Sequence, residues 1–385
     1  MNIGIDIRCL MQKELTGVGE YTYNLLKHLF EIDNQNQYYL FFNSHKKVSI
    51  PEFKFSNVHY CKFNYPNKLL NFSLKLFRYP KLDNLIKKQI TEPGLRAERG
   101  NLERCGIDLF FFPNITFQAT NCPYIITCHD LSFKLFPEFL DWKRKLWHFI
   151  LNPKKQYQRA KQVLAVSQNT ANDLNSKLKI ANSIKTYSGI SNEYKQLDKD
   201  NPSLLKIKAK YDLPQNFIFS LGTLEPRKNY ISLIEAFKKF NQQNTDYKLI
   251  IAGPKGWKHK KTIKLIKQTQ NVRYIEYITN QEKLFFYNLA TMFVFPSFYE
   301  GFGFPSLEAQ ACGCPVIASN NSSLSETLSD SALLINSHNT KELIKSIQEM
   351  SKPEIQSYFR NKGLENIKTY KWEKTANQIK TQFLS

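Results

Sequence analysis

The sequence has no long apolar run, although 42% of its 385 residues are hydrophobic. Runs such as 109–112 fall far short of the ~20 residues that a helix needs to cross a bilayer. The beginning of the chain also lacks a basic stretch followed by an apolar core, because Asp6 and Arg8 interrupt an alternating apolar pattern. We therefore expect neither a membrane span nor a secretory signal, and we expect the protein to lie in the cytoplasm.

The cysteines lack the spacing of a disulfide or zinc framework. Their number is odd, no C-x-x-C pair occurs, and Cys312 and Cys314 flank a glycine in an apolar stretch that suits packing better than zinc. We expect all seven to be structural thiols, and we expect no metal site. They are Cys9, Cys61, Cys105, Cys122, Cys128, Cys312 and Cys314.

Acidic residues are few in comparison with basic ones: 33 Asp and Glu stand against 54 Lys and Arg, a formal net charge of +21. Such an excess attracts an anionic partner, and nucleic acid, a membrane surface and phosphorylated substrates all qualify. The charge is concentrated in 54–88, with eight basic residues and one acidic residue, and in 143–161, with seven basic residues and no acidic one. Because no nucleic-acid-binding module is recognisable, we expect no nucleic-acid partner.

Segments with strand spacing alternate with helical patterns along the whole chain. At roughly 150 residues per domain the chain has room for two domains, and a polar stretch at 191–202 separates two such alternations. We predict an α/β fold with two doubly wound, Rossmann-like domains. The predicted strands are 2–7, 38–42, 107–112, 124–128 and 162–166 in the first, and 217–221, 248–252, 272–275, 292–295 and 315–318 in the second.

The sharpest functional signal follows the predicted strand 217–221. There Gly222 and Thr223 lead to Arg227 and Lys228, which we expect at the start of a helix. A guanidinium can bind two oxygens and a helix start adds exposed N–H groups, so this segment suits an anion such as a diphosphate. A solvated helix start with two surface cations is the alternative interpretation.

A second signal is the segment EGFGFPSLE at 300–308. Pro305 suits the start of a helix, which places Glu300 in the preceding glycine loop and Glu308 in the first turns of the helix. Carboxylates accept hydrogen bonds from pairs of hydroxyls, as a sugar offers, and the helix start beside them suits phosphate. For Glu308, a favourable acid near a helix start explains the sequence equally well.

Together these segments resemble the retaining glycosyltransferases of family GT4, which have the GT-B fold. The resemblance rests on G-T-x-E-P-R-K-N at 222–229, F-P-S-x-x-E-G-F-G at 295–303 and the E-x7-E spacing of Glu300 and Glu308. Five further segments follow in the family's order: TGVGEYTYNLL at 16–26, CHDLSF at 128–133, VSQNTANDL at 166–174, AGPKGW at 252–257 and YKWEKTA at 370–376.

The resemblance implies roles for individual residues. Arg227 and Lys228 would hold the donor diphosphate and stabilise the leaving nucleotide, Glu300 would face the donor sugar, and Glu308 would hold the ribose. The implied catalytic residues are His129, Arg227, Lys228 and Glu300, and the implied donor-binding residues are Gly17, Gly19, Asp130, Gly222, Thr223, Gly301, Phe302, Gly303, Phe304 and Glu308.

The implied residues of the first half also have plainer explanations. A lone histidine after a strand, such as His129, is more often structural. Gly17 and Gly19 lie between the first strand and a helix predicted for 21–30, where glycines let a ligand approach the backbone or simply form a tight turn. Ser188 stands where the family usually has Asn, which weakens any role there.

The resemblance also implies a domain arrangement in which two domains face each other across a cleft. An acceptor-side domain would span 1–195, a nucleotide-sugar-binding domain would span 196–368, and the C-terminal helix 369–385 would cross back onto the first. Within that helix Trp372, Ala376, Ile379 and Phe383 have amphipathic spacing.

The implied reaction transfers a sugar from a nucleotide donor with retention of configuration, without a metal or other cofactor. The sequence looks most like bacterial mannosyltransferases that use GDP-mannose for O-antigen or capsule-type glycans. UDP-sugar donors remain the alternative within the class, and a GT-B scaffold that binds a sugar nucleotide without transferring it remains the alternative outside it.

The basic, aromatic-rich stretch 53–88 is typical of a peripheral helix on anionic lipid. With the cluster 143–161 it would bring the enzyme to a glycan or lipid-linked acceptor on the inner face of the cytoplasmic membrane. A solvated basic face with one apolar side in the core is the alternative.

Overall fold

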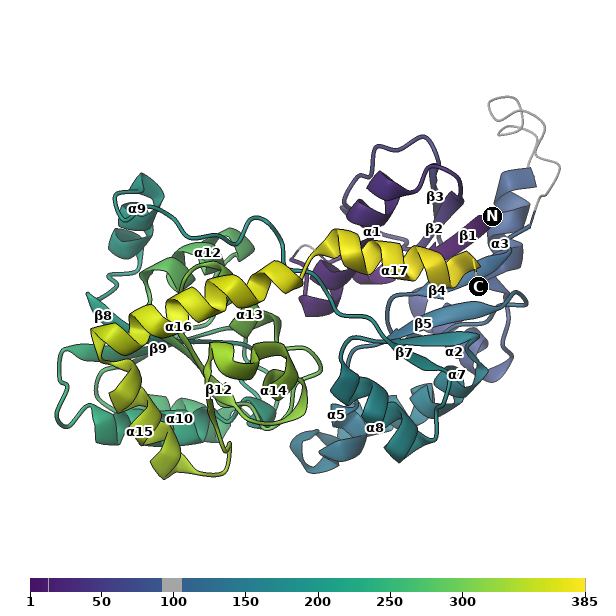
Figure 1. Ribbon diagram of the computed structural model, residues 1–385. Coiled ribbons are helices and arrows are strands. Elements are labelled where there is room, and N and C mark those ends of the chain that lie inside the picture. Colours follow the sequence, from purple (N-terminus) through teal and green to yellow (C-terminus); the bar gives the residue numbers. More distant parts are fainter. Residues whose placement is uncertain (13, 92–105, 385) are drawn as a thin grey trace. The chain divides into compact units, whose positions relative to one another are not determined.

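The computed structural model describes residues 1–12, 14–91 and 106–384, which form two compact units (Figure 1). The first unit comprises Met1–Leu131, Lys143–Gly189 and the C-terminal segment from Trp372, and the second comprises Ser132–Trp142 and Ile190–Lys371. The chain thus passes into the second unit at residue 190, slightly before the boundary expected at 195. The short segment 132–142 belongs to the second unit although it lies within the first half of the sequence.

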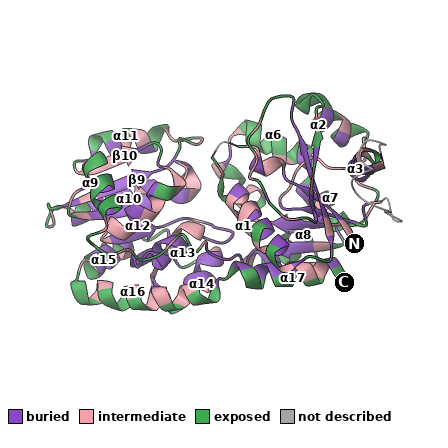
Figure 2. Cartoon of the chain, turned by 90° about the horizontal axis from the view of Figure 1, so that it is seen from above, coloured by how far each residue is buried: buried purple, intermediate pink, exposed green. Residues whose placement is uncertain are grey.

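The first unit contains a parallel sheet with the strand order β3-β2-β1-β4-β5-β6-β7 among the described residues. In its centre Ile3 of β1 pairs with Tyr38 of β2 on one side and Leu109 of β4 on the other. The central strands are buried almost throughout (Figure 2), as expected for a parallel sheet covered on both faces. The strands are β1 (Asn2–Asp6), β2 (Gln37–Asn43), β3 (Val58–Phe63), β4 (Leu109–Phe112), β5 (Tyr124–Cys128), β6 (Gln162–Ala165) and β7 (Ser183–Lys185).

The helices of the first unit alternate with these strands, and the C-terminal helix α17 packs against α1. Burial of Trp372, Ala376, Ile379 and Phe383 accounts for the amphipathic spacing of α17. The helices are α1 (Gly17–Ile32), α2 (Asn67–Leu76), α3 (Leu82–Thr91), α6 (Trp142–Leu151, whose first residue falls in the second unit), α7 (Pro153–Arg159), α8 (Gln168–Leu178) and α17 (Trp372–Leu384).

The second unit contains a parallel sheet with the order β10-β9-β8-β11-β12-β13 among its described residues. Leu233, Ile234 and Phe237 form the apolar face of α10 and are fully buried in the core of this unit. The strands are β8 (Asn216–Leu221), β9 (Tyr247–Ala252), β10 (Val272–Ile275), β11 (Met292–Phe295), β12 (Val316–Ser319) and β13 (Leu333–Ile335). The helices are α5 (Ser132–Leu135), α9 (Pro202–Lys210), α10 (Tyr230–Phe240), α11 (Lys260–Gln268), α12 (Asn280–Leu289), α13 (Phe304–Ala311), α14 (Ser322–Leu328), α15 (Thr340–Met350) and α16 (Pro353–Asn366), with short 3₁₀ turns between some of them.

Both sheets are parallel and alternate with helices, which confirms the predicted α/β class. Three strands were not predicted from the sequence, β3, β7 and β13, and all three lie at a sheet edge. Edge strands are short and partly exposed, so they carry a weaker apolar pattern than central strands. The stretch 53–88, in which we expected a peripheral helix, contains the strand β3 and the helix α2 and reaches into α3.

The expected glycine loop before the first helix is also wrong. The helix α1 begins at Gly17, so Gly17 and Gly19 both lie in its first turn, with Thr16 as the residue before it. A side chain at Gly17 would meet no atom within 4 Å, whereas one at Gly19 would press against Leu15 at 3.1 Å. Close packing therefore accounts for Gly19 and gives no reason for Gly17.

Six cysteines lie among the described residues, and all are free thiols. Burial raises the pKa of Cys9 and of Cys122 to about 11, and it also raises the pKa values of Cys312 and Cys314. These pKa values keep the thiols protonated near neutral pH, as expected for packing residues. Cys105 lies outside the described residues.

Candidate functional site

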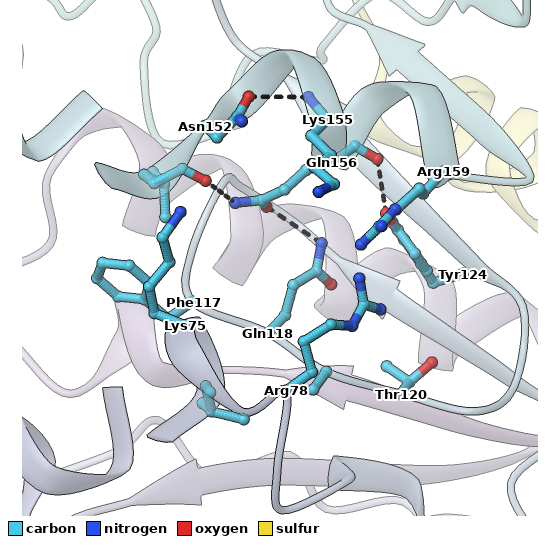
Figure 3. A pocket seen from close by; sticks show the side chains of 13 residues that line it. Lys75, Arg78, Phe117, Gln118, Thr120, Tyr124, Asn152, Lys155, Gln156 and Arg159 are labelled. Carbon is cyan, nitrogen blue, oxygen red and sulfur yellow. Dashed lines mark hydrogen bonds between the residues drawn. The ribbon is translucent and has the colours of Figure 1, made fainter. Parts of the chain in front are cut away.

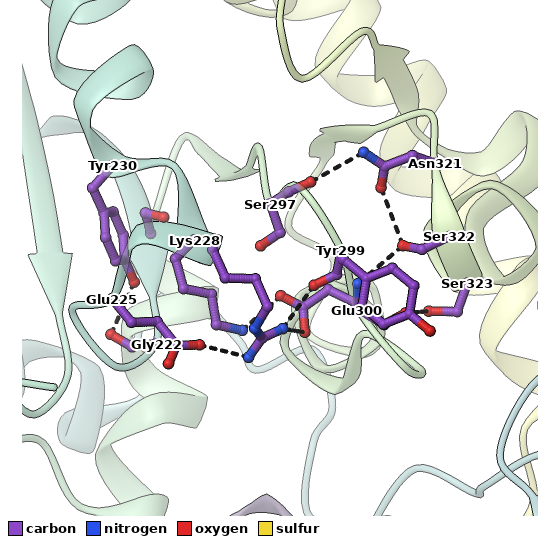
Figure 4. A network of polar contacts seen from close by, with 12 residues as sticks. Gly222, Glu225, Lys228, Tyr230, Ser297, Tyr299, Glu300, Asn321, Ser322 and Ser323 are labelled. Carbon is purple, nitrogen blue, oxygen red and sulfur yellow. Dashed lines mark hydrogen bonds and ion pairs between the residues drawn. The ribbon is translucent and has the colours of Figure 1, made fainter. Parts of the chain in front are cut away.

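The polar centre of the second unit joins two segments that follow neighbouring strands (Figure 4). The strand β8 ends at Leu221 and β11 ends at Phe295, and these strands pair in parallel. The carboxyl ends of parallel neighbours meet at the same edge of the sheet. The loop after β8 therefore comes next to the loop after β11, although more than 70 residues separate them in the sequence.

Glu300 contacts both cations of this polar centre. Its Oε1 accepts from Lys228 Nζ at 2.7 Å, and its Oε2 accepts from Arg227 Nη1 at 2.9 Å. Arg227 Nη2 also donates to Glu225 Oε1 at 2.6 Å. Two carboxylates thus neutralise two cations, and each cation contacts Glu300. We call these four residues the Glu300 cluster.

The Glu300 cluster is largely removed from water. Glu300 is 7% exposed and Lys228 is 9% exposed, and the Lys228 ammonium lies over the Phe295 ring at 4.6 Å from its centroid. Burial acts to raise the pKa of Glu300, but the charges of Arg227 and Lys228 outweigh it and lower this pKa to about 2. Glu300 is therefore a carboxylate at any physiological pH, held ionised by its two partners.

We expected Arg227 and Lys228 at the start of an α-helix, and this prediction is wrong. They lie in a 3₁₀ turn, Pro226–Lys228, and Asn229 with its left-handed backbone separates this turn from α10. The side-chain amide of Asn229 donates from Nδ2 to the carbonyls of Pro296 and Ser337 at 3.1 and 2.8 Å. The turn directs both cations towards Glu300 instead of leaving them on a solvated helix start, so the alternative interpretation is also wrong.

The glycine loop after β11 is held by its backbone. The Glu300 amide donates to Ser322 Oγ at 3.0 Å, and Ser323 Oγ donates to the Glu300 carbonyl at 2.9 Å. Gly303 has a φ of +92°, and a side chain there would come within 2.5 Å of Leu324. Only glycine fits this position without strain. Gly301 and Phe302 lie in this loop, and Phe304 begins α13.

Glu308 lies one turn into α13, as the sequence predicts. It is 4% exposed, and the Tyr287 hydroxyl of α12 donates to its Oε2 at 2.9 Å. Burial, and then the charge of Glu308, raise the pKa of Tyr287, so this hydroxyl remains a donor. Glu308 is therefore a buried, hydrogen-bonded group and not merely a favourable acid at a helix start.

The loops after β8 and β9 are packed backbone to backbone. Gly253 has a φ of +132°, and a side chain there would come within 2.3 Å of the Gly222 carbonyl oxygen. A side chain at Gly256 would meet Thr223 at 2.6 Å, and the Tyr230 hydroxyl donates to the Gly222 carbonyl at 2.9 Å. The sequence does not show a role for Gly253 or Gly256, because their close contacts arise only when β8 pairs with β9.

The segment 132–142 packs beside the Glu300 loop within the second unit. Phe136 lies against Tyr299 with ring centroids 5.5 Å apart, and Phe139 stacks on Phe298 at 5.4 Å. Trp257 Nε1 donates to the Phe139 carbonyl at 2.6 Å. Since the Tyr299 carbonyl also accepts from Arg227 at 2.7 Å, this segment supports the loop that carries Glu300.

His129, Asp130, Gly17 and Gly19 belong to the first unit, whereas the Glu300 cluster belongs to the second. His129 follows β5 directly, and its Nε2 bonds to the Pro113 carbonyl at 2.8 Å, so Nε2 carries the proton. Its ring packs edge-on against Tyr21 at 4.8 Å, and burial lowers its pKa. His129 is therefore a neutral, anchored imidazole.

Two family models match the chain. The model described as Glycosyltransferase Family 4 matches residues 15–186, and the model described as Glycosyl transferases group 1 matches residues 205–366. The chain belongs to the glycosyltransferase family that these two models together describe. The predicted enzyme class is thereby confirmed.

Individual relatives of this glycosyltransferase agree with the family models. The chain is 28% identical to O-antigen chain mannosyltransferase B of Escherichia coli over an alignment of 378 residues, and the match covers 94% of this chain and 94% of that protein. Among solved structures, sucrose-phosphate synthase from Thermosynechococcus elongatus gives a TM-score of 0.75 at 18% identity, covering 100% of this chain and 98% of that chain. Anabaena HepE in complex with UDP-glucose gives a TM-score of 0.67 at 17% identity, and the match covers 100% of this chain and 99% of that chain. These likenesses confirm the GT-B fold.

The lowered pKa of Glu300 predicts an acid-labile component of stability. Its folded pKa of about 2 lies below its ordinary value of 4.5, so the stabilisation is complete above about pH 4.5 and is lost as the pH falls towards 2. This component is on the order of 3 kcal/mol. The Glu300→Gln variant should lack this pH dependence, and at neutral pH it should be less stable by about 3–5 kcal/mol because Lys228 loses a buried partner.

Denaturant unfolding between pH 7 and pH 3 measures both effects. Glu349→Gln, at an exposed position on α15, is the matched control and should follow the wild type. A Glu300→Gln variant with the stability and pH dependence of the wild type would show that the ion pairs contribute nothing.

Proposed function

We propose that this glycosyltransferase transfers mannose from GDP-mannose to a glycan or lipid-linked acceptor, with retention of configuration, in the synthesis of a cell-surface polysaccharide such as O-antigen. The observation that carries this proposal is the Glu300 cluster, which holds two cations and two carboxylates at the carboxyl edge of a parallel sheet. Similarity to the E. coli O-antigen chain mannosyltransferase B along 94% of both chains supports mannose as the sugar.

The chemistry requires positive charge at the leaving group. A sugar nucleotide is already activated, so the barrier lies in separating a cationic sugar from a diphosphate that gains charge. Preorganised cations stabilise such a transition state because they need no rearrangement at the moment of reaction. Arg227, Lys228 and the N–H groups at the start of α13 supply that charge in our proposal, so we assign no metal. The departing phosphate helps to deprotonate the acceptor, and no protein general base is assigned.

We propose that donor binding exchanges the partners of the Glu300 cluster. Without a donor, Glu300 holds Arg227 and Lys228 by ion pairs of 2.9 and 2.7 Å. A diphosphate carries more negative charge than one carboxylate and competes for both cations. Glu300 then accepts hydrogen bonds from the sugar hydroxyls, while Glu308 binds the nucleotide ribose. Gly222, Thr223 and the backbone of Gly301–Phe304 complete the donor site within the second unit. In our proposal Gly17, Gly19 and Asp130 also bind the donor, and His129 contacts the donor sugar or the acceptor.

A UDP-sugar is the second candidate donor. Anabaena HepE, whose fold is similar over the whole chain, has been solved with UDP-glucose. Both donors present a diphosphate to Arg227 and Lys228, so the proposed chemistry is the same and only the base and the sugar differ.

We also propose peripheral contact with an anionic membrane. No helix within residues 1–12, 14–91 and 106–384 is long and apolar enough to span a bilayer. Two helices of the first unit instead expose large apolar side chains next to lysines and arginines, as membrane-surface helices do. The exposed residues are Leu69, Phe72 and Leu76 on α2 with Phe77 directly after it, and Leu146, Trp147, Phe149 and Ile150 on α6.

The donor proposal predicts selective stabilisation by nucleotide. GDP-mannose at 100 times its dissociation constant should stabilise the folded protein by about 2.7 kcal/mol. Thermal unfolding with GDP-mannose, GDP, UDP-glucose and UDP measures this, and EDTA should leave the effect unchanged. Stabilisation by UDP-glucose instead would replace the donor within the same class, and no response to any of the four would contradict the donor site.

Loss of either cation should slow transfer. Arg227→Ala and Lys228→Ala should each reduce the release of GDP from GDP-mannose by ~10²-fold or more, as removal of a preorganised charge contact does. Glu300→Ala should reduce turnover more than GDP affinity. Lys239→Ala is the control, because it removes the same positive charge from an exposed position on α10. Wild-type rates in both cation variants would refute the assignment of the diphosphate site.

A further inference from the structure

A small basic pocket lies in the first unit, remote in sequence from the Glu300 cluster (Figure 3). Its walls come from the end of α2, the loop 117–120, the first residue of β5 and the helix α7. Its volume is about 130 Å³, well below the roughly 300 Å³ at which pockets for drug-sized ligands begin. A space of this size suits a single small group better than a whole sugar nucleotide.

Four cations line this pocket, namely Lys75, Arg78, Lys155 and Arg159, and its lining contains no Asp or Glu. None of the four forms an ion pair within the described part of the first unit. This differs from the Glu300 cluster, where two carboxylates neutralise two cations. Like charges around one concave space repel one another, and an anion bound between them would relieve that repulsion.

The neutral side chains of the pocket form a fixed frame. Gln118 Nε2 donates to Gln156 Oε1 at 3.1 Å, and Gln156 Nε2 donates to the Leu151 carbonyl at 3.0 Å. The Tyr124 hydroxyl donates to the Gln156 carbonyl at 2.6 Å. Figure 3 shows these bonds, which hold together the side chains contributed by the loop 117–120, β5 and α7. Gln118 Oε1 is buried and accepts no hydrogen bond from the described residues.

We propose that this pocket, the Lys75 pocket, binds a phosphoryl group, supplied by the headgroup of an anionic phospholipid. Two guanidinium groups match phosphate oxygens in pairs, and the two lysines add point charges. Exposed apolar side chains next to lining residues in the sequence favour a lipid as the source: Leu76 and Phe77 lie between Lys75 and Arg78 and are 61% and 67% exposed. A phosphate held in the pocket would place these apolar side chains where the acyl chains begin. The site depends neither on the donor nor on the Glu300 cluster.

Two double variants test the Lys75 pocket. Arg78→Ala with Arg159→Ala removes two charges from it, and Lys27→Ala with Lys177→Ala removes two charges from exposed positions of the same unit. The general attraction of a basic surface falls equally in both. A third variant, Arg78→Lys with Arg159→Lys, keeps the charge and loses the paired geometry. Thermal unfolding first checks that all three variants fold.

Binding to phosphatidylglycerol vesicles and to inorganic phosphate, both measured at 0.15 M salt, then tests the proposal. We expect the arginine-to-alanine pair to bind vesicles at least about tenfold more weakly than the matched lysine control, and the arginine-to-lysine pair to fall between them. A loss confined to phosphate binding would keep the phosphoryl site and assign it a soluble phosphate instead of a lipid. Equal losses in the two alanine pairs, or no loss in either assay, would overturn the proposal. Transfer from the donor is measured separately, so failure of the donor proposal would leave this result intact.

Discussion

The second unit depends on one buried carboxylate that contacts two cations. Glu300 ties the loop after β8 to the loop after β11 through Lys228 and Arg227. Buried ion pairs are often no more stabilising than apolar packing, but loss of one partner is costly because it leaves a charge uncompensated. The arrangement therefore fixes the positions of the charges more than it adds stability. For a reaction whose barrier lies in charge separation, fixed charges are what lowers the barrier.

The surrounding structure is arranged to keep this cluster in place. The parallel pairing of β8 with β11 brings the two loops together, and Gly303 and Gly253 allow backbone turns that other residues would strain. The segment 132–142 adds stacked rings against Phe298 and Tyr299. Contacts from three separate parts of the sequence, 227–228, 322–324 and 132–142, thus converge on the loop that carries Glu300. The first unit contributes a different electrostatic setting, in which the cations of the Lys75 pocket remain without acidic partners among the described residues of that unit.

The sequence predicted the central strands well because a strand buried on both faces is a continuous apolar run. Among these it predicted β5 and β11 with the bounds that the structure has, and it also predicted the bounds of the edge strand β10. It also predicted that Glu300 lies in a glycine loop and Glu308 on the following helix, because Pro305 marks the helix start.

What the sequence did not predict depends on contacts between distant residues. No local pattern shows that Glu300 pairs with Arg227 and Lys228, since the ion pairs follow from the order of the strands. Glu225 falls within a quoted motif, yet its pairing with Arg227 requires the 3₁₀ turn. Likewise, the aromatic residues of 132–142 read as one more apolar stretch, and only the structure shows that they pack in the second unit.

The central claim is that the Glu300 cluster receives the donor diphosphate. A crystal structure of the protein with GDP-mannose and EDTA tests it most directly. We predict diphosphate oxygens within hydrogen-bond distance of Arg227 and Lys228, with at least one of their bonds to Glu300 broken and the Glu300 carboxylate facing the sugar. A diphosphate bound away from both cations, with both ion pairs to Glu300 intact, would contradict the account.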